Sequence, residues 1–158
     1  MTDPQNRSIS IHQWLLLART SSAPPVTITL AGDSMRPLIR RHRDRVTIIP
    51  VDRPLRRGDI VLIRTQSSLY VVHRIWKKKN GLVRTLGDWC INPEPWMPEE
   101  QILGRVVKLQ RGSKSMPTDS FPLRIFCSIW TAAYPLRKYC LILQGKAAAV
   151  VRKIPKTR

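Results

Sequence analysis

Short β-type runs separated by turn residues limit the fold of this chain more than any other feature of the sequence. Turn residues such as those at 56–59 and 77–81 separate the runs, and no helical period intervenes. Consecutive short strands without helices between them predict an antiparallel sheet, so we expect a mainly β fold. The six expected strands cover residues 26–30, 45–49, 60–63, 69–76, 82–86 and 102–109.

The segments on either side of these strands have a different pattern. A short helix is expected near residues 8–18, followed by a linker, so residues 1–25 form an N-terminal segment ahead of a β-rich domain at 26–110. Residues 111–158 form a basic tail with a helical pattern interrupted at Pro135. This tail is predicted either to lie at a membrane surface or to pack on the β-domain. The apolar side chains expected on one helical face are Ile125, Phe126, Ile129, Trp130 and Ala133.

The net charge of +18 over 158 residues indicates an anionic partner. Residues 121–158 contain eight Lys or Arg and no acid, which favours an anionic membrane surface as that partner. Nucleic acid is not expected, because the first 25 residues are too short for a helix-turn-helix. Residues 81–104 alone are acidic, with four carboxylates against Arg84.

The three cysteines, at 90, 127 and 140, are too few and too widely spaced for a disulfide framework or a zinc site. We therefore expect a reducing compartment, no metal and no cofactor. The N-terminal apolar run at residues 9–18 is short and interrupted, and no window of about twenty apolar residues follows.

A serine in a turn is the first candidate for chemistry. The stretch Gly32-Asp33-Ser34-Met35-Arg36-Pro37 follows the first expected strand, and a positive φ at Gly32 would lift the Ser34 hydroxyl clear of it. Serine needs a base to become a nucleophile. His73, in the fourth strand, is the one histidine with a fixed orientation, and its reference pKa of about 6.5 suits a base that becomes active between pH 6 and 7. Asp88 and Glu94, in the acidic loop, are candidates for the carboxylate that orients the imidazole.

Five motifs in this order resemble the signal peptidase I superfamily, over about residues 26–109. Within it, the histidine is similar to the archaeal and endoplasmic-reticulum type rather than to the common bacterial type with lysine. The resemblance implies a coiled β-sheet serine endopeptidase that cleaves signal or leader peptides without a metal. It assigns Ser34 as nucleophile and His73 as base, and places the third member of the triad at Glu94, where most relatives carry Asp. The motifs are Gly32 to Pro37, Arg57 to Val61, Val72 to Ile75, Gly87-Asp88 and Ile102 to Val106.

Several points of this interpretation stay open from the residues alone. Either Asp88 or Glu94 could complete the triad, and Met35 and Pro37 are expected to shape the substrate groove. The family normally has a membrane anchor ahead of the serine, and none is found here. We therefore expect a cytoplasmic protein, or one bound peripherally at the inner face of the membrane. The alternative function is a catalytically inactive module of the same fold that binds a membrane surface or nucleic acid.

Overall fold

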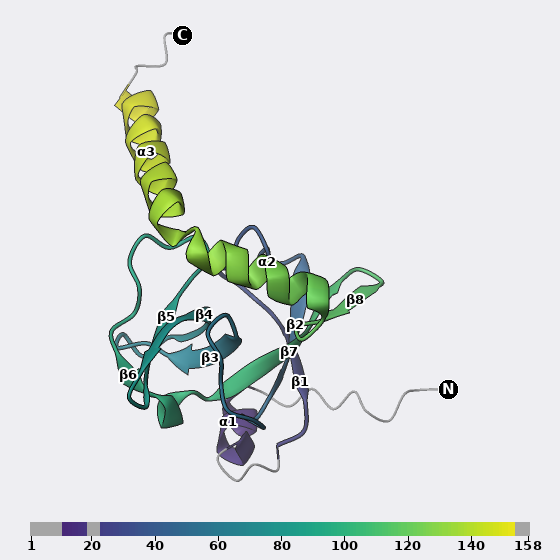
Figure 1. Ribbon diagram of the computed structural model, residues 1–158. Coiled ribbons are helices and arrows are strands. Elements are labelled where there is room, and N and C mark those ends of the chain that lie inside the picture. The colour runs from purple at the N-terminus through teal and green to yellow at the C-terminus, as the bar shows by residue number, and fades with distance from the viewer. Residues whose placement is uncertain (1–10, 19–22, 154–158) are drawn as a thin grey trace.

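The fold is mainly β, as the sequence predicts: the described residues form an eight-stranded antiparallel sheet accompanied by three α-helices. The computed structural model describes residues 11–18 and 23–153, with side chains described from 13 to 18 and from 23 to 144. Figure 1 shows the sheet coiled around itself, α2 crossing one end of it and α3 extending away. The strands are β1 (Val26–Thr29), β2 (Asp44–Ile49), β3 (Ile60–Arg64), β4 (Tyr70–Lys79), β5 (Leu82–Leu86), β6 (Met97–Pro98), β7 (Gly104–Arg111) and β8 (Lys114–Pro117).

Strand β7 connects the two parts of the sheet. The strand order is β1-β2-β7-β3-β4-β5-β6, and β8 pairs with β7 as a hairpin. The first residues of β7 pair with β3, at Val61–Arg105 and Leu62–Gly104, while its whole length runs beside β2. Among the strands described, β7 thus gives the hydrogen-bonded link between β1–β2 and the block β3 to β6.

Alternate side chains of β3 enter two different apolar clusters. Ile60 and Leu62 lie in a main cluster with the fully buried Trp14, Met35 and others. Val61 and Ile63 face a second cluster that includes Ile75, Val83 and Ile102. Because successive side chains of a strand point to opposite faces, a strand covered on both sides needs a continuous apolar run. The sequence of β3 has this property, with four buried residues in succession.

The N-terminal helix α1 (Ile11–Ala18) is part of this main cluster rather than a separate segment. The Trp14 indole donates a hydrogen bond of 2.7 Å to the Pro24 carbonyl. A Cβ on Gly104 would lie only 2.7 Å from the Trp14 ring, so the close contact between α1 and the start of β7 requires glycine. The rest of the expected N-terminal segment, 1–10 and 19–22, lies outside the described residues, as do 154–158.

The tail forms two helices, α2 (Phe121–Ala132) and α3 (Tyr134–Lys153), which meet beside Pro135 as the sequence predicts. The β-structure extends past the expected boundary at residue 110, because β8 folds back on β7 through a turn at Gly112, whose φ is 56°. Within the described ranges, no helix is long and apolar enough to cross a membrane.

Candidate functional site

Ser34 lies in a tight turn that follows β1. The Arg36 amide donates to the Asp33 carbonyl at 3.1 Å, and the Ile39 amide donates to the Met35 carbonyl at 2.9 Å. Gly32 does not have the positive φ that we expected, and a Cβ added there would meet nothing within 4 Å. The turn therefore depends on residues 33–36 and not on Gly32. The Ser34 amide donates no hydrogen bond to another residue that the structure describes, so it is free to bind a substrate oxygen.

Gly87 brings the serine to the strand that pairs with β4. The Trp89 amide donates to the Ser34 carbonyl at 2.7 Å. A Cβ on Gly87 would lie 2.8 Å from the Ser34 carbonyl oxygen and 3.0 Å from the Ser34 Cβ, so only glycine allows this contact. Arg74 pairs with Leu86 in the β4–β5 ladder, and the neighbouring positions are His73 and Gly87. In this antiparallel register Gly87 follows on opposite His73. The contact between Ser34 and Gly87 therefore brings the serine close to His73.

His73 points into the second apolar cluster from the middle of β4, opposite Val61 of β3. Its side chain is only 7% exposed, and burial lowers the pKa of the imidazole to about 4. The ring is therefore neutral at physiological pH, as a general base must be. Its Nδ1 atom is buried without a hydrogen-bond partner. An unpaired buried nitrogen is uncommon, because it costs free energy that a partner would recover.

Glu94 is the carboxylate that faces this nitrogen. Its Oε1 lies 3.7 Å from His73 Nδ1, slightly beyond hydrogen-bond distance. The main chain of Glu94 is held on both sides, since its amide donates to the Thr85 carbonyl and its own carbonyl accepts from Arg84, each at 2.8 Å. The side chain therefore needs only a small rotation to reach the imidazole.

Glu94 also lacks the basic partner that most acids of this chain have. In the part of the chain described, only Glu94 and Glu100 have no Lys or Arg within ion-pair distance, although the chain carries a charge of +18. Arg84, the nearest basic residue in sequence to the loop, binds the Glu94 backbone and not its carboxylate. The carboxylates that do pair with Lys or Arg are Asp33, Asp44, Asp52, Asp59, Asp88, Glu99 and Asp119.

Asp88, the other candidate for the third member, binds a different residue. Both its oxygens accept from the Arg74 guanidinium, at 2.8 Å from Nε and 2.6 Å from Nη2. Arg74 also donates to the Gly58 carbonyl at 3.0 Å, and both charged side chains are almost fully buried. Burial acts to lower the pKa of Arg74, but the hydrogen bonds and charge of Asp88 outweigh it and raise that pKa. Asp88 thus ties β4 to the loop, and its carboxylate is not directed to His73.

Met35 and Pro37, the residues expected to shape a substrate groove, have different surroundings. Met35 is fully buried in the main cluster and cannot line a surface groove here, so that expectation is wrong for its side chain. Because Met35 follows Ser34 directly, its burial instead fixes the serine turn to the core. Pro37 is exposed on the outer side of the turn.

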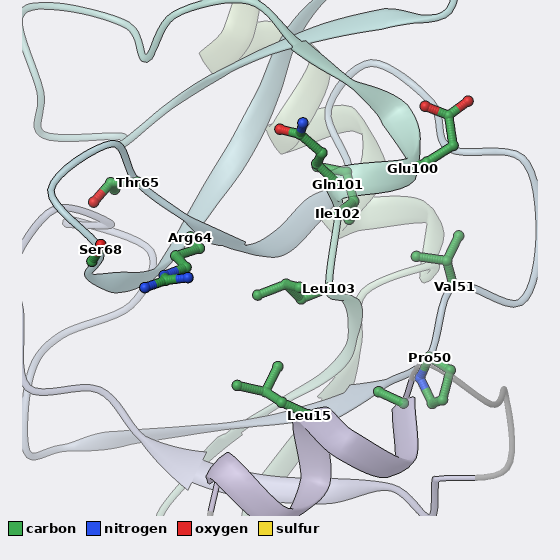
Figure 2. Close-up of a pocket in the computed structure, with 11 residues that line it drawn as sticks. Leu15, Pro50, Val51, Arg64, Thr65, Ser68, Glu100, Gln101, Ile102 and Leu103 are labelled. Carbon is green, nitrogen blue, oxygen red and sulfur yellow. The ribbon is translucent and has the colours of Figure 1, made fainter.

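Two adjoining cavities lie near the loop that carries Glu94. The smaller, of about 210 Å³, is lined by Glu94, Trp96 and Met97 among others. The larger, of about 650 Å³, shares Arg64, Thr65 and Gln101 with it, so the two form one cleft that extends towards α1. Figure 2 shows Leu15 of α1 and Leu103, just before β7, pointing into the larger cavity, with Arg64 at the end of β3 beside it. Neither lining includes Ser34.

The remaining reactive group near the site is the Cys90 thiol, which is half-buried beside Gly87. Burial and the negative charge of Glu94 raise its pKa. A thiol with a raised pKa carries little thiolate at neutral pH, so Cys90 is a poor nucleophile. Within the described residues, no group of three or more His, Cys, Asp or Glu side chains could hold a metal ion.

Sequence reasoning did not identify Arg74 or the contact of Gly87 with Ser34. A signal for Arg74 was present, since an arginine between Val72 and Ile75 in an otherwise apolar strand needs a buried carboxylate. Gly87 was part of a motif, but nothing in the sequence indicated that it contacts Ser34, because a glycine at the end of a strand usually indicates only a turn.

Comparison of the chain with protein-family models, with curated proteins and with solved structures finds no significant match.

Proposed function

We propose that the protein is a serine endopeptidase in which Ser34, His73 and Glu94 form the catalytic triad. The observation that carries the proposal is the unpaired Nδ1 of His73, which faces a carboxylate that no Lys or Arg neutralises. A buried imidazole of merely structural role would be expected to have a hydrogen bond to each buried nitrogen. The proposal includes the coiled β-sheet peptidase fold that the sequence motifs imply.

Ser34 would act as the nucleophile. Its hydroxyl oxygen attacks the scissile carbonyl carbon while the imidazole of His73 takes the hydroxyl proton. The tetrahedral intermediate then collapses, the C–N bond breaks, and the imidazolium returns the proton to the leaving amine. Water then attacks the acyl carbon while His73 takes its proton, and as the ester C–O bond breaks the proton passes to the Ser34 oxygen and the acid product leaves. The free Ser34 amide is a donor for the developing oxyanion.

Glu94 would hold the imidazole tautomer and stabilise the imidazolium. Moving the carboxylate oxygen from 3.7 Å to hydrogen-bond distance gives Nδ1 the acceptor it lacks. Ser34 and His73 make no hydrogen bond to each other in the part of the chain that the structure describes. Catalytic hydrogen bonds often shorten only when substrate is bound, so this geometry is compatible with the role.

The cleft beside Glu94 would hold the substrate chain on one side of the scissile bond. Its two cavities provide apolar contacts from Leu15, Leu103 and Met97, and Arg64 and Gln101 at the junction offer donors to a peptide backbone. An extended signal or leader peptide, with an apolar segment, suits such a cleft. The same lining would serve a cytoplasmic leader peptide or an exported precursor.

Labelling with a fluorophosphonate probe tests the proposal. We expect the probe to modify Ser34, as located by peptide mass spectrometry, and Ser34→Ala to abolish both labelling and cleavage of a degenerate peptide library. Ser115→Ala is the matched control, because Ser115 is an exposed serine in β8. If the folded wild-type protein shows neither labelling of Ser34 nor cleavage, the catalytically inactive alternative is correct.

A further inference from the structure

The outward face of α2, and that of α3 as far as its side chains are described (residues 134–144), is apolar, although helices of this kind normally turn polar residues to water. On α2, the face formed by Leu123, Cys127 and Thr131 is buried against the domain. On the opposite face Phe121, Ile125 and Ile129 recur every four residues, and they are 77%, 44% and 63% exposed. A helix that packs through one face and shows a second apolar face needs a second partner.

The same arrangement continues on α3. Tyr134, Arg137 and Leu141 are buried, and Leu136, Tyr139 and Leu143 lie on the other side with exposures of 65% to 70%. We call these six residues, three from each helix, the outer apolar face. In Figure 1 the two helices form the margin of the molecule that lies away from α1.

Positive charge lies beside the α2 part of this outer apolar face. Arg124, next to Ile125 on α2, lines a hollow together with Arg56 and Arg57 of the loop before β3. The acids that also line it, Asp59 and Asp119, are already paired with Arg53. Arg56, Arg57 and Arg124 are exposed, and none is in ion-pair distance of a carboxylate in the part of the chain described. Beyond the described side chains the sequence adds five more Lys or Arg after residue 144 and no acid.

We propose that the outer apolar face docks in the plane of an anionic lipid bilayer. The six apolar side chains enter the boundary between headgroups and acyl chains, and the bordering arginines bind lipid phosphates. This proposal is independent of the chemistry at Ser34, and would hold for an inactive protein as well.

Charge favours this partner over the other two candidates. A second copy of the chain would bring one +18 surface against another, with no acid in residues 121–158 of either copy to compensate. Nucleic acid would match the charge, but its phosphates offer nothing to a stripe of Phe, Ile and Leu. A bilayer with anionic headgroups satisfies both the apolar and the basic parts.

Vesicle co-sedimentation of the full chain tests the docking. We expect binding to vesicles of equal parts phosphatidylcholine and phosphatidylglycerol, about tenfold or more weaker binding at 0.5 M salt, and little binding to phosphatidylcholine alone. The triple variant Phe121→Ser, Ile129→Ser, Leu136→Ser should lose at least tenfold in partition coefficient. All three side chains are exposed, so thermal unfolding should be unchanged.

The matched control replaces Leu69, Leu82 and Met116 by serine, three apolar residues exposed elsewhere on the domain. This variant should bind vesicles as the wild type does. Equal vesicle binding by the two triple variants would overturn the proposal, as would equal binding to neutral and anionic vesicles. If the protein binds a short DNA duplex more tightly than it binds anionic vesicles, and the first triple variant binds the duplex as tightly as the wild type does, the partner is nucleic acid instead. A dimer that this variant dissociates, seen by sedimentation velocity without lipid, would favour self-association.

Discussion

At the scale of single residues, the two acids of the loop have opposite roles. Asp88 is buried and gives both its oxygens to Arg74, whereas Glu94 faces an imidazole and no guanidinium. Removing the charge of Asp88 would leave the Arg74 guanidinium buried without an ionic partner. Breaking a buried ion pair in this way costs about 3–5 kcal/mol, which is a large part of the total stability of a small domain. Removing the charge of Glu94 leaves no cation without a partner.

We therefore predict that Glu94→Gln lowers turnover by up to about four orders of magnitude while the free energy of unfolding changes little. Asp88→Asn should instead lower the free energy of unfolding by roughly 3 kcal/mol or more. Peptide cleavage and urea unfolding of both variants make the comparison. A stable Asp88→Asn protein without activity, next to an active Glu94→Gln protein, would reverse the two assignments.

The burial of His73 sets a second prediction, on pH. Because its pKa is lowered to about 4, the imidazole proposed as the base loses its proton well below the range of 6 to 7 that an unperturbed imidazole would give. The acid limb of kcat/KM should accordingly lie near pH 4 to 5. A limb centred at pH 6.5 would show that the imidazole is solvated in the working enzyme.

The same burial makes the stability of the fold depend on pH. Between about pH 4 and 6.5 the unfolded chain binds a proton at His73 and the folded chain does not, so stability falls as the pH decreases through this window. With about 1.4 kcal/mol for each pKa unit, the loss is on the order of 3 kcal/mol. We expect the free energy of unfolding of the wild type, relative to that of His73→Gln, to be lower at pH 4 than at pH 7 by this amount. Urea unfolding of both proteins at the two pH values measures it. A difference that does not vary with pH would contradict the lowered pKa.

At the scale of elements, the strands with a clear apolar pattern could be predicted, and those without one could not. Strands β1 to β5 and β7 have such a pattern, and the expected ranges agree to within a few residues. All four residues of β8 are exposed, so they carry no alternation that could identify a strand. β6 has two residues and forms only because the loop returns to β5.

The site shows the same division. Ser34, His73 and the two candidate acids could be named from sequence motifs, but the preference for Glu94 over Asp88 in the proposed triad rests on the position of Arg74. Which of the two carboxylates binds Arg74 is decided by the tertiary structure, and the sequence alone does not show it. Likewise, the face expected for α2 contained Ile125 and Trp130 together. In the structure Ile125 is exposed and Trp130 is half-buried, because the core contacts the helix along Leu123, Cys127 and Thr131.

The start of α3 supports the loop that carries Glu94. The Tyr134 hydroxyl donates to the Ile91 carbonyl at 2.7 Å, and its ring lies 4.7 Å from that of Trp76 on β4. We predict that Tyr134→Phe speeds amide hydrogen exchange in residues 87–98 and lowers the free energy of unfolding by about 1 kcal/mol, because the Ile91 carbonyl loses its donor. Tyr139→Phe, at an exposed position on the same helix, is the control. Equal exchange in the two variants would mean that the loop does not depend on α3.

At the scale of the whole molecule, the acids hold the fold together and the excess basic residues remain at the surface. Arg105 binds Asp52 and Asp119, and Arg53 binds Asp119 and Asp59, so one chain of ion pairs joins β7 to the loops on either side. Arg43 and Arg111 hold Asp44 in the same way; burial opposes this, but the hydrogen bonds lower the pKa of the Asp44 carboxyl. Because most acids of the described part pair with Lys or Arg, the basic residues in excess of these pairs give the molecule its charge of +18 and a mainly basic exterior.

The central position of β7 also determines when a growing chain can fold. Until residues 104–111 have been synthesised, β2 and β3 both have an unpaired edge, and the blocks β1–β2 and β3 to β6 share no ladder. Contacts this distant in sequence slow folding, and open edges favour aggregation. We expect a chain that ends at residue 103 to lack a cooperative thermal transition and to aggregate, whereas a chain that ends at residue 120 should fold. On the ribosome the domain would therefore stay dependent on chaperones until its last long strand emerges.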